Sequence, residues 1–499
     1  MIFKSVSDWE NKTEKSFFIE QISVYIRLVQ VFCEKENIPF ECDDADVVDE
    51  LKSIGVIDNA EELPTLKKEV PALYDDFIKA VRIAVKYGEQ MDGLLDKLYN
   101  SKRKQIQSVA KKKKNLTLVD FFCGAGGLSL GFLQEGFNVK LANDIEDVCI
   151  QTYKYNHPEL PTDKLIQGDI KQIVDHIEDY IDGDIDIVVG GPPCQGFSEA
   201  NRQRVIDDPR NKLYKYFVKA VEKIAPKFVV MENVKGMLKV ADQVVEDYGK
   251  LRVKGDCSYL VSYRILNSQE FNVAQSRERL IYIAIRSDVA EQKGITPNQI
   301  FDLIEQKHSG NRHFTLEEAL RDIKPLDAPR IKNMNEVDSD TTGKKIDVNA
   351  YVDADNDYLN LINMGRRIPY VYNHKARYVS DVNYEIYKRL NQGDDATDEK
   401  IKDIMPYAHR NHCFKDKYYK LVADRPCRTI TAHLRMDCHS HIHPYQIRAI
   451  SPREAARIQS FPDDYLFWGA YLKTYMQIGN AVPTMMARGI AAVIKEFLK

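Results

Sequence analysis

Long apolar runs and paired cysteines are missing from this sequence. Stretches such as Leu280 to Ile285 are far too short to span a membrane, and the polar start, Met1 to Lys15, has no apolar signal core. The nine cysteines are irregularly spaced, and no two of them form a Cys-x-x-Cys pair. These absences predict a protein of the reducing cytoplasm with no membrane partner.

An excess of one charge is absent as well. Lysine and arginine total 71 against 75 acidic residues, which gives a formal net charge of −4. A polyanionic partner would therefore have to meet a local basic face, and the balance by itself argues neither for nor against nucleic acid. The 499 residues, 44% of them hydrophobic, are enough for two or three domains with separate cores.

The first 114 residues predict a separate helical module. Apolar residues recur at helical spacing in Phe17 to Phe32 and again in Leu73 to Leu98. The segment ends in basic runs, Lys102 to Lys104 and Lys111 to Lys114, which fit either a solvated linker or a strip that contacts phosphates. We expect a chain starting near Ser108 to fold without this module.

The rest of the chain divides into three parts. Residues 115–287 alternate short β-branched runs with helical stretches, as in a parallel sheet covered by helices. Residues 288–443 lose this alternation and predict a smaller mixed domain. Residues 444–499 return to helical periodicity and are expected to pack back on the sheet. The predicted fold class is therefore α/β.

The segment from Gly190 to Ser198 presents one cysteine, Cys194, where a strand should end. Ile185 to Val189 is typical of a short buried strand. Two glycines then let the backbone turn sharply, while two prolines fix the backbone and remove two donors, so the loop is stiff. An isolated cysteine is more often a buried apolar residue. The stiff loop favours a nucleophile instead.

Other unusual residues follow the ends of neighbouring predicted strands, where ligands bind in open parallel sheets. They are Asp120 to Gly127, Asn143-Asp144, Gly168-Asp169-Ile170 and Glu232-Asn233-Val234. The glycine loop alone fits a dinucleotide, another ligand or mere close packing. Asp144, about twenty residues past the loop, could accept hydrogen bonds from ribose hydroxyls, and Asp169 could reach an adenine amino group. Without an evident phosphate-binding lysine, this pattern predicts nucleoside recognition.

Six ordered motifs resemble those of the DNA (cytosine-5)-methyltransferase family of bacterial restriction-modification or defence systems. They are Asp120 to Gly127, Pro193-Cys194-Gln195, Glu232-Asn233-Val234, Gln275 to Arg279, Arg425 to Thr431 and Gly479 to Pro483. The resemblance covers about Leu116 to Lys499 except a variable portion, and it does not cover the first 114 residues. It implies a Rossmann-like methyltransferase sheet that binds S-adenosyl-L-methionine.

The resemblance also implies covalent chemistry at carbon 5 of a cytosine. Cys194 would add to carbon 6, because carbon 5 is a poor nucleophile until electrons are pushed onto it. Glu232 would hydrogen-bond or protonate ring nitrogen 3, Arg279 would hold the exocyclic oxygen, and Arg277 would support the site. Loss of the carbon 5 proton and of Cys194 would then release 5-methylcytosine.

Cofactor roles are carried over by position in the same way. Phe122 would stack against adenine, Gly124 and Gly126 would admit the methionine part, and Asp144 would bind ribose. The remaining implied contacts are Asp169, Ile170, Leu213, Asn480 and Val482. Ile145 stands where related enzymes often carry a large aromatic residue, which predicts looser packing there.

Double-stranded DNA is the implied substrate, with the cytosine flipped out because a duplex buries its reacting faces. The resemblance implies target recognition in about Asp288 to Tyr370, with Asn373 to Tyr419 as a framework. Candidate base or phosphate contacts, each of which could equally be an ordinary surface charge, are Arg312, Arg330, Arg366, Arg367 and Arg377. The implied role is protection of host DNA, with a cognate restriction endonuclease or other defence proteins as partners.

Competing interpretations explain less of the chain. A transfer-RNA cytosine methyltransferase would share the motifs, but the sizeable recognition region and the absence of a Cys-Phe-Thr tripeptide argue against it. A catalytically silent DNA-binding relative would lack Cys194 or Glu232, and a dinucleotide oxidoreductase would not explain Cys194. The run Cys438 to His443, with His433, Cys427 and Cys413 nearby, could suggest zinc. No paired Cys-x-x-Cys accompanies it, so we expect no metal.

Overall fold

The computed structural model describes most of the chain in two compact units. The described residues are 3, 5–9, 11–43, 46–88, 90–91, 116–193, 213–332, 338–348, 356–366, 368, 370–406 and 417–498. One unit consists of Met1–Gln105 together with Lys344–Val348. The other consists of Ile106–Gly343 and Asn349–Lys499. The N-terminal unit is therefore discontinuous in sequence.

The N-terminal unit is built from helices and one strand. Its elements are α1 (Lys12–Glu36), α2 (Val48–Ser53), η1 (Ala60–Glu62), α3 (Leu63–Glu69), α4 (Tyr74–Lys86) and most of β8 (Gly343–Val348). Phe18, Ile22 and Val29 of α1 pack with Phe77 and Val81 of α4 in one core. The apolar spacing that predicts helices here thus forms the buried faces of both.

Helix α1 differs from the expectation that the chain holds no apolar run long enough to span a membrane. Residues Glu14–Glu36 are long and apolar enough to cross a membrane, and half of that stretch is buried. Its buried apolar side chains, such as Ile22 and Phe32, belong to the core of the N-terminal unit. Packing within this unit therefore accounts for the apolar face of α1.

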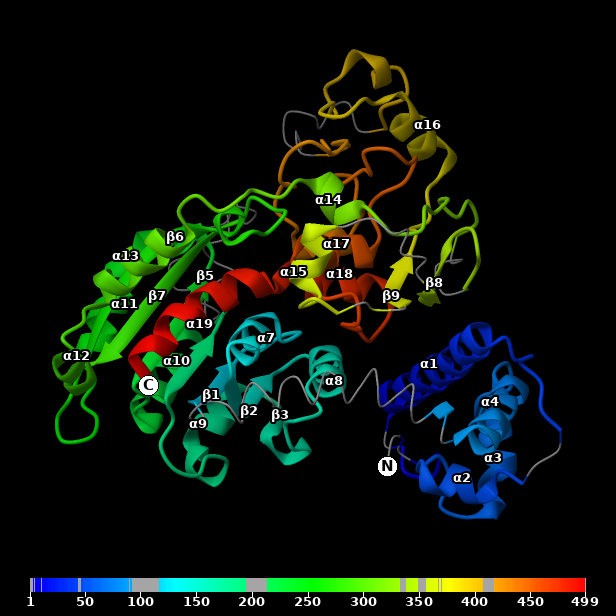
Figure 1. Cartoon of the computed structure of the whole chain (residues 1–499), viewed down its shortest axis with the longest axis horizontal. Helices are drawn as coiled ribbons and strands as arrows, with labels where there is room; N and C mark the ends of the chain where they lie inside the picture. The colour runs from blue at the N-terminus through cyan, green and yellow to red at the C-terminus, as the bar shows by residue number, and fades with distance from the viewer. Residues whose placement is uncertain are drawn as a thin grey trace. The chain divides into compact units, whose positions relative to one another are not determined.

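The larger unit contains a seven-stranded sheet in the order β3-β2-β1-β4-β5-β7-β6 (Figure 1). The strands are β1 (Leu116–Phe121), β2 (Phe137–Asp144), β3 (Leu165–Gln167), β4 (Ile187–Gly190), β5 (Phe228–Asn233), β6 (Tyr259–Asn267) and β7 (Glu278–Arg286). Strands β1 to β5 are parallel, whereas β7 runs antiparallel to β5 and to β6. The predicted α/β sheet is confirmed, with an antiparallel edge that the prediction of a parallel sheet did not include.

Helices cover both faces of this sheet. Successive strand residues point to opposite faces, so Leu118 and Val230 enter one core while Val119 and Val229 enter the other. The first core includes side chains of α7 (Gly127–Gln134), α8 (Asp147–Asn156), α12 (Ser287–Lys293), α13 (Pro297–His308) and α19 (Thr484–Leu498). The second includes side chains of α9 (Ile170–Asp175), α10 (Leu213–Ile224) and α11 (Ala241–Gly249).

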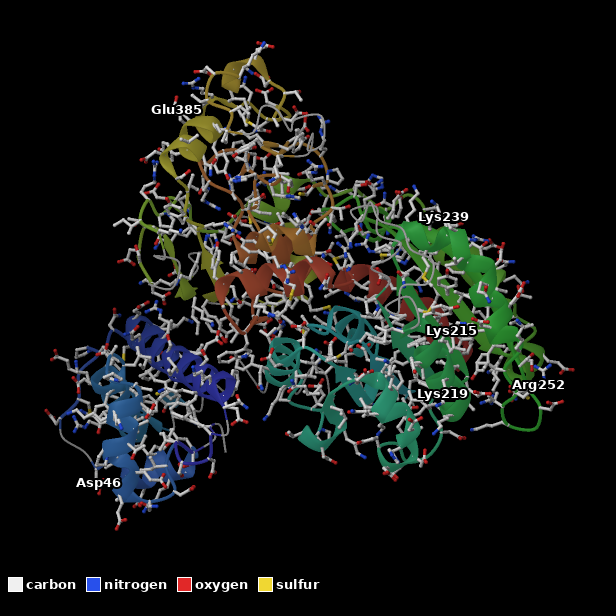
Figure 2. All side chains as sticks on the ribbon, turned by 180° about the vertical axis from the view of Figure 1, so that it is seen from behind. Asp46, Lys215, Lys219, Lys239, Arg252 and Glu385 are labelled. Carbon is white, nitrogen blue, oxygen red and sulfur yellow. The ribbon has the colours of Figure 1, made fainter. Side chains whose placement is uncertain are left out.

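The C-terminal helix of the larger unit, α19, packs on the same face of this sheet as α7. Helix α19 lies against α7 so closely that a Cβ atom at Gly131 would fall 2.5 Å from the Cβ of Ala487. On the opposite layer, Tyr214 and Phe217 of α10 are buried, while Lys215 and Lys219 project from the outside of that helix (Figure 2). The C-terminal segment thus closes one face, and charged side chains border the other layer.

Shorter elements make up the rest of the larger unit. They are α14 (Leu316–Leu320), α15 (Asp357–Ile362), β9 (Tyr370–Lys375), α16 (Asp381–Arg389), α17 (Pro452–Ile458), α18 (Tyr471–Asn480) and the 3-10 turns η3 (Thr162–Lys164), η4 (Ile177–Asp179), η7 (Lys235–Val240), η8 (Ser268–Phe271), η10 (Glu399–Ile401) and η12 (Ala432–Arg435). Helix α17 begins with a capping box in which Ser451 and Glu454 each bond the other's backbone amide. Buried polar contacts such as these fix a region that has few strands.

Candidate active site

The carboxyl ends of β1, β2, β4 and β5 lie at one edge of the sheet, because these strands are parallel neighbours. This edge carries the glycine loop after β1, Asp144 at the end of β2 and Glu232 near the end of β5. Predicted site residues from distant parts of the sequence therefore share one rim. In open α/β sheets such a rim is the usual place for a ligand.

The loop that carries Cys194 leaves β4 at this rim. Residues 194–212, and so Cys194 itself, lie outside the described residues. The beginning of the loop is fixed, because Asn233 Nδ2 donates to the carbonyl of Pro192 at 2.9 Å. A Cβ atom at Gly191 would come within 3.1 Å of Glu232 Oε2. The start of the cysteine loop thus packs directly against the end of β5.

Glu232 and Arg279 form an ion pair across two antiparallel strands. Arg279 Nε lies 2.7 Å from Glu232 Oε1, and the two side chains are 14% and 12% exposed. Burial lowers the pKa of the Arg279 guanidinium, whereas the charge of Glu232 raises it. The pair is therefore a mostly desolvated carboxylate and guanidinium at the rim, able to interact with both an acceptor and a donor on one ligand.

Arg277 is buried, and its side chain binds backbone carbonyls of two segments that are far apart in sequence. Its guanidinium donates to the carbonyls of Ile430 at 2.5 Å, Gly479 at 3.0 Å and Ala481 at 3.1 Å. Gln275 binds one of these segments as well, because its Oε1 accepts from the amide of Ile430 at 2.6 Å. Arg277 therefore holds together segments that are far apart in sequence, and its support of the reaction stays a prediction.

The glycine loop adopts left-handed backbone at three positions. Phe122, Gly124 and Gly126 have φ values of 56°, 52° and 83°. The amide of Gly124 donates to Asp144 Oδ2 at 2.8 Å, so the loop and the end of β2 are directly joined. A Cβ atom at Gly124 would meet nothing within 4 Å. The loop thus borders open space next to a carboxylate.

Asp144 is held in place by backbone donors. Its Oδ1 accepts from the amide of Glu146 at 2.9 Å, and its Oδ2 accepts from Gly124. Burial raises the pKa of the Asp144 carboxyl, while these two bonds lower it. A carboxylate with both oxygens oriented in this way can still accept a ligand hydroxyl through its remaining lone pairs.

A second layer of polar contacts supports the glycine loop from below. The hydroxyl of Tyr465 donates to the carbonyl of Ala125, and His157 Nε2 lies 3.0 Å from the same hydroxyl. A Cβ atom at Gly126 would collide with both side chains, at 2.8 Å and 2.7 Å. The sequence analysis missed Tyr465 and His157, because their role depends on contact over more than three hundred residues.

Asp120 lies within the same supporting layer. Its carboxylate accepts from the hydroxyl of Ser129, which in turn accepts from Tyr153 Oη at 2.9 Å. Burial raises the pKa of the Asp120 carboxyl to about 7. The first motif therefore begins with a fully buried acid that anchors α7 to β1.

The remaining predicted cofactor residues are spread around the rim. Asp169 caps α9, where its Oδ1 accepts from the amide of Lys171 at 3.0 Å. Ile170 and Val482 are buried, Leu213 begins α10, and Asn480 is exposed. Ile145 is 65% exposed, so its side chain is available at the surface beside Asp144.

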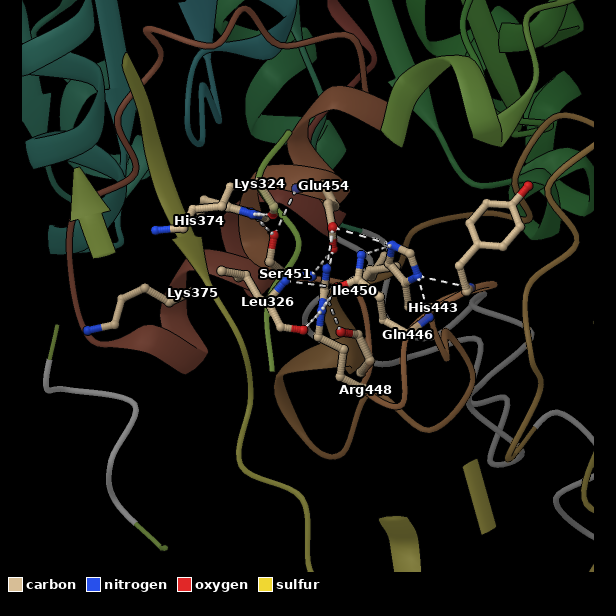
Figure 3. Close-up of polar contacts among 12 residues, drawn as sticks. Lys324, Leu326, His374, Lys375, His443, Gln446, Arg448, Ile450, Ser451 and Glu454 are labelled. Atoms are coloured by element: carbon tan, nitrogen blue, oxygen red, sulfur yellow. Dashed lines mark hydrogen bonds and ion pairs between the residues drawn. The ribbon is translucent and has the colours of Figure 1, made fainter. Parts of the chain in front are cut away.

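Two buried histidines, His443 of the run that could suggest zinc and His374 outside that run, are engaged in other contacts. His374 Nε2 donates to the carbonyl of Lys324 at 2.7 Å, and its Nδ1 accepts from Ser451 Oγ at 2.9 Å (Figure 3). His443 Nδ1 accepts from the amides of Tyr445 and Gln446, both at 3.1 Å. Among the residues that the structure describes, no group of three or more His, Cys, Asp or Glu could hold a metal ion.

Two of the arginines considered for DNA contact have structural partners instead. Arg366 forms a bidentate ion pair with Asp464, in which Nη1 lies 2.5 Å from Oδ2 and Nη2 lies 3.1 Å from Oδ1. Arg377 donates to the carbonyls of Leu434 at 3.0 Å and Met436 at 2.7 Å. Both guanidinium groups therefore hold the fold, and a DNA contact by either of them stays a prediction.

The other three arginines are more exposed or lie elsewhere. Arg312 pairs with Glu318 and with Asp357, the latter at 3.2 Å. Arg330 pairs with Asp381, and Arg367 lies outside the described residues. The guanidinium groups of Arg312 and Arg330 are partly solvated and already neutralised locally, which fits the alternative of an ordinary surface charge.

Comparisons with known proteins identify the family of this chain. Residues 116–496 match the family described as C-5 cytosine-specific DNA methylase. Type II methyltransferase M.DdeI of Desulfomicrobium norvegicum is 31% identical over 77% of this chain and 89% of its own length. Type II methyltransferase M.Sau96I of Staphylococcus aureus is 29% identical over 93% of this chain and 96% of its own, so that alignment extends into the N-terminal unit.

A solved structure supports the fold independently. A crystal structure titled as a putative DNA modification methyltransferase encoded within an E. coli prophage has a TM-score of 0.56 and 24% identity, covering 77% of this chain and 99% of that one. The family match spans the whole sheet and every predicted motif. This chain therefore belongs to the C-5 cytosine-specific DNA methylase family and is a DNA cytosine-5 methyltransferase.

Proposed function

We propose that this enzyme transfers a methyl group from S-adenosyl-L-methionine to carbon 5 of a flipped-out cytosine in a specific double-stranded DNA sequence. The observation that carries the proposal is the Glu232–Arg279 pair, 2.7 Å apart, beside the start of the cysteine loop. A carboxyl group, a guanidinium and a thiol are the groups that cytosine activation requires. The convergence of Glu232 and Arg279 near the start of the loop that carries Cys194 supports one catalytic centre.

The residues at the glycine loop fit the nucleoside part of this cofactor. Open space at Gly124 lies beside the Asp144 carboxylate, which suits a ribose, while the half-buried Phe122 offers apolar surface for adenine. Ile170, which is buried, would border that base from the core side. Leu213, Asn480 and Val482 would complete the contacts, and Asp169 would border the base. When bound, the cofactor supplies an electrophilic methyl group, and the chain's part is to hold it at the rim.

Cys194 would begin the chemistry as a thiolate. Its sulfur forms a bond to carbon 6 of the cytosine, and the electrons of the carbon 5–carbon 6 double bond move toward ring nitrogen 3. A proton held by Glu232 stabilises that nitrogen, and Arg279 donates to the exocyclic oxygen. Carbon 5 then acts as the nucleophile that accepts the methyl group.

Product release would reverse the addition. A base removes the proton of carbon 5, the double bond re-forms, and the carbon 6–sulfur bond breaks to regenerate the Cys194 thiolate. Arg277 has no direct step in this scheme. It maintains the site, because its three carbonyl contacts fix the segments that follow Ile430 and Gly479.

The biological role is proposed from the relatives. Two of them are named as type II methyltransferases, so we infer protection of host DNA in the cytoplasm, alongside a restriction endonuclease or another defence component. Residues 288–443 would recognise the target sequence, with the cytosine flipped out of the helix.

Methylation of defined DNA tests the proposal. The purified enzyme is incubated with duplexes of varied sequence and cofactor carrying a labelled methyl group, and bisulfite sequencing then locates the modified base. We expect label at cytosine carbon 5 within one short sequence. Label in transfer RNA but not in DNA would support the rejected alternative and overturn the assignment of substrate.

A further inference from the structure

The N-terminal unit contains a strand from far along the chain. Lys344–Val348 joins Met1–Gln105 in one compact unit, although Ile106–Gly343 lies between them in sequence. This strand comes from the middle of residues 288–443, the proposed target-recognition region. The N-terminal module looks like a simple extension in the sequence. In the structure it includes a strand from the region that is expected to recognise DNA.

Two contacts on one face of α1 hold this strand. Glu20 forms an ion pair with Lys345. Arg27, about two helical turns further along the same face, donates from its Nε to the carbonyl of Ile346 at 2.8 Å. The strand is thus bound through both a side chain and its backbone.

These contacts differ from ordinary surface pairs in their burial. The side chains of Glu20 and Lys345 are 16% and 20% exposed, and Ile346 is fully buried. Arg27 is also buried, and its other nitrogens are fixed by Glu34, at 2.6 Å and 3.2 Å. Because a buried donor without an acceptor is costly, α1 is organised in advance to receive the carbonyl of Ile346.

We propose that the N-terminal unit acts as a clamp on Lys344–Val348 and so positions the target-recognition region for DNA, a role that rests on the proposed function of that region. The chain leaves the unit on both sides of the strand, toward Gly343 and toward Asn349. Any shift of the strand is therefore passed covalently to both flanks.

The proposed clamp predicts how removal of the N-terminal module affects DNA binding. A chain that starts near Ser108 lacks Glu20 and Arg27, and so leaves Lys345 and the carbonyl of Ile346 without these partners. We now expect such a chain to bind the cofactor but to lose affinity for its DNA target. The N-terminal unit then contributes to recognition of the DNA target.

Charge reversal tests the clamp in the full-length protein. Glu20→Lys and Lys345→Glu each bring like charges together, whereas the double variant restores an opposite pair. We expect either single variant to speed hydrogen–deuterium exchange at Lys344–Val348 by about tenfold and to raise the KM for DNA by about three- to tenfold. The double variant should return both toward the wild-type values.

Two controls separate the clamp from general damage. The Kd for S-adenosyl-L-methionine should stay within about twofold, because the cofactor motifs lie in the other unit. Lys52→Glu changes an exposed charge on α2 of the N-terminal unit and should alter neither exchange at the strand nor the KM for DNA. If a single variant also loses cofactor binding, Arg27→Lys is measured instead, since it keeps the charge but changes the donor to Ile346.

Each outcome decides the proposal. Unchanged exchange at Lys344–Val348 in the single variants, or no recovery in the double variant, would overturn the clamp. Faster exchange with an unchanged KM for DNA and an unchanged target sequence would overturn its role in recognition. Exchange is measured without DNA, so a wild-type enzyme that methylates no DNA would count against the proposed function and still leave the clamp tested.

Discussion

Arg279 Nε lies 2.7 Å from Glu232 Oε1, and this contact joins two motifs that are far apart in sequence. The pair is mostly shielded from water and sits where β5 and β7 run side by side. Glu232 is therefore held in a fixed position, and its proposed chemistry can be tested by a change that preserves its shape.

Glu232→Gln should remove proton donation while keeping the side chain's volume. We expect kcat to fall by about a hundred- to ten-thousandfold, the usual contribution of a positioned acid or base, with little change in cofactor affinity. Glu278→Gln is the matched control, because Glu278, on the neighbouring strand β7, forms an exposed pair with Lys235, at 2.8 Å. Equal loss of activity in both variants would contradict a catalytic role for Glu232.

Asp144→Ala should weaken cofactor binding. A hydrogen bond to a charged group is worth about 1.5–3 kcal/mol, so the Kd for S-adenosyl-L-methionine should rise by roughly ten- to a hundredfold. Turnover at saturating cofactor should change less. Calorimetry on this variant and on Asp163→Ala, an exposed control, makes the comparison, and an unchanged Kd would exclude Asp144 from ribose binding.

Tyr465→Phe should make the glycine loop less rigid, although every residue of the loop itself is unchanged. Loss of one net hydrogen bond, about 0.5–1.5 kcal/mol, predicts a three- to tenfold rise in the Kd for the cofactor. Tyr471→Phe is the control, because Tyr471 is another buried tyrosine that donates to a carbonyl, that of Lys375 at 3.0 Å. If both variants lower the melting temperature alike but neither changes the Kd, Tyr465 has a purely structural role.

Much of the sheet could be predicted from the sequence, because β1, β4 and β5 are continuous apolar runs followed by glycine or acid. Strand β6 was missed, since Tyr259–Asn267 mixes polar and apolar residues, as an edge strand does. Contacts between distant segments were also missed. The bond of Tyr465 to Ala125 and the binding of Ile346 by Arg27 leave no local pattern in the chain.

Two arginines show that a sequence can also suggest more surface contacts than the fold leaves available. Arg366 and Arg377 look like candidates for phosphate contact because charge is visible in a sequence while partners are not. Asp464 pairs with the first inside the fold, and the carbonyl of Met436 accepts a hydrogen bond from the second. Charge alone therefore overestimates the surface available for DNA.

Acid should destabilise the protein through its buried histidines. Burial lowers the pKa of His374 to about 4 and of His443 to about 3, against about 6.5 in an unfolded chain. As the pH falls below about 6.5, the unfolded state binds protons that the folded state does not, so stability is complete above that pH and is lost as the pH falls from about 6.5 to about 4 for His374 and about 3 for His443.

Thermal melting at a series of pH values checks this expectation. His374→Gln can retain polar contacts but cannot titrate, so its melting temperature should depend less on pH than that of the wild type. His313→Gln is the control, because His313 is exposed. An identical pH dependence in the wild type and in His374→Gln would contradict the assignment.

Covalent capture is the most direct measurement of the central claim, that Cys194 forms a bond to the target cytosine. A thiol with a pKa near 8.5 is mostly protonated at neutral pH, so the attack should depend on binding of both substrates. DNA with 5-fluorocytosine at the target cannot lose its carbon 5 substituent. We predict that it traps the wild-type enzyme in a denaturation-resistant complex in the presence of cofactor, whereas Cys194→Ala binds cofactor but forms no complex. A wild-type enzyme that methylates ordinary DNA yet is never trapped, or a Cys194→Ala variant that still methylates, would contradict the account.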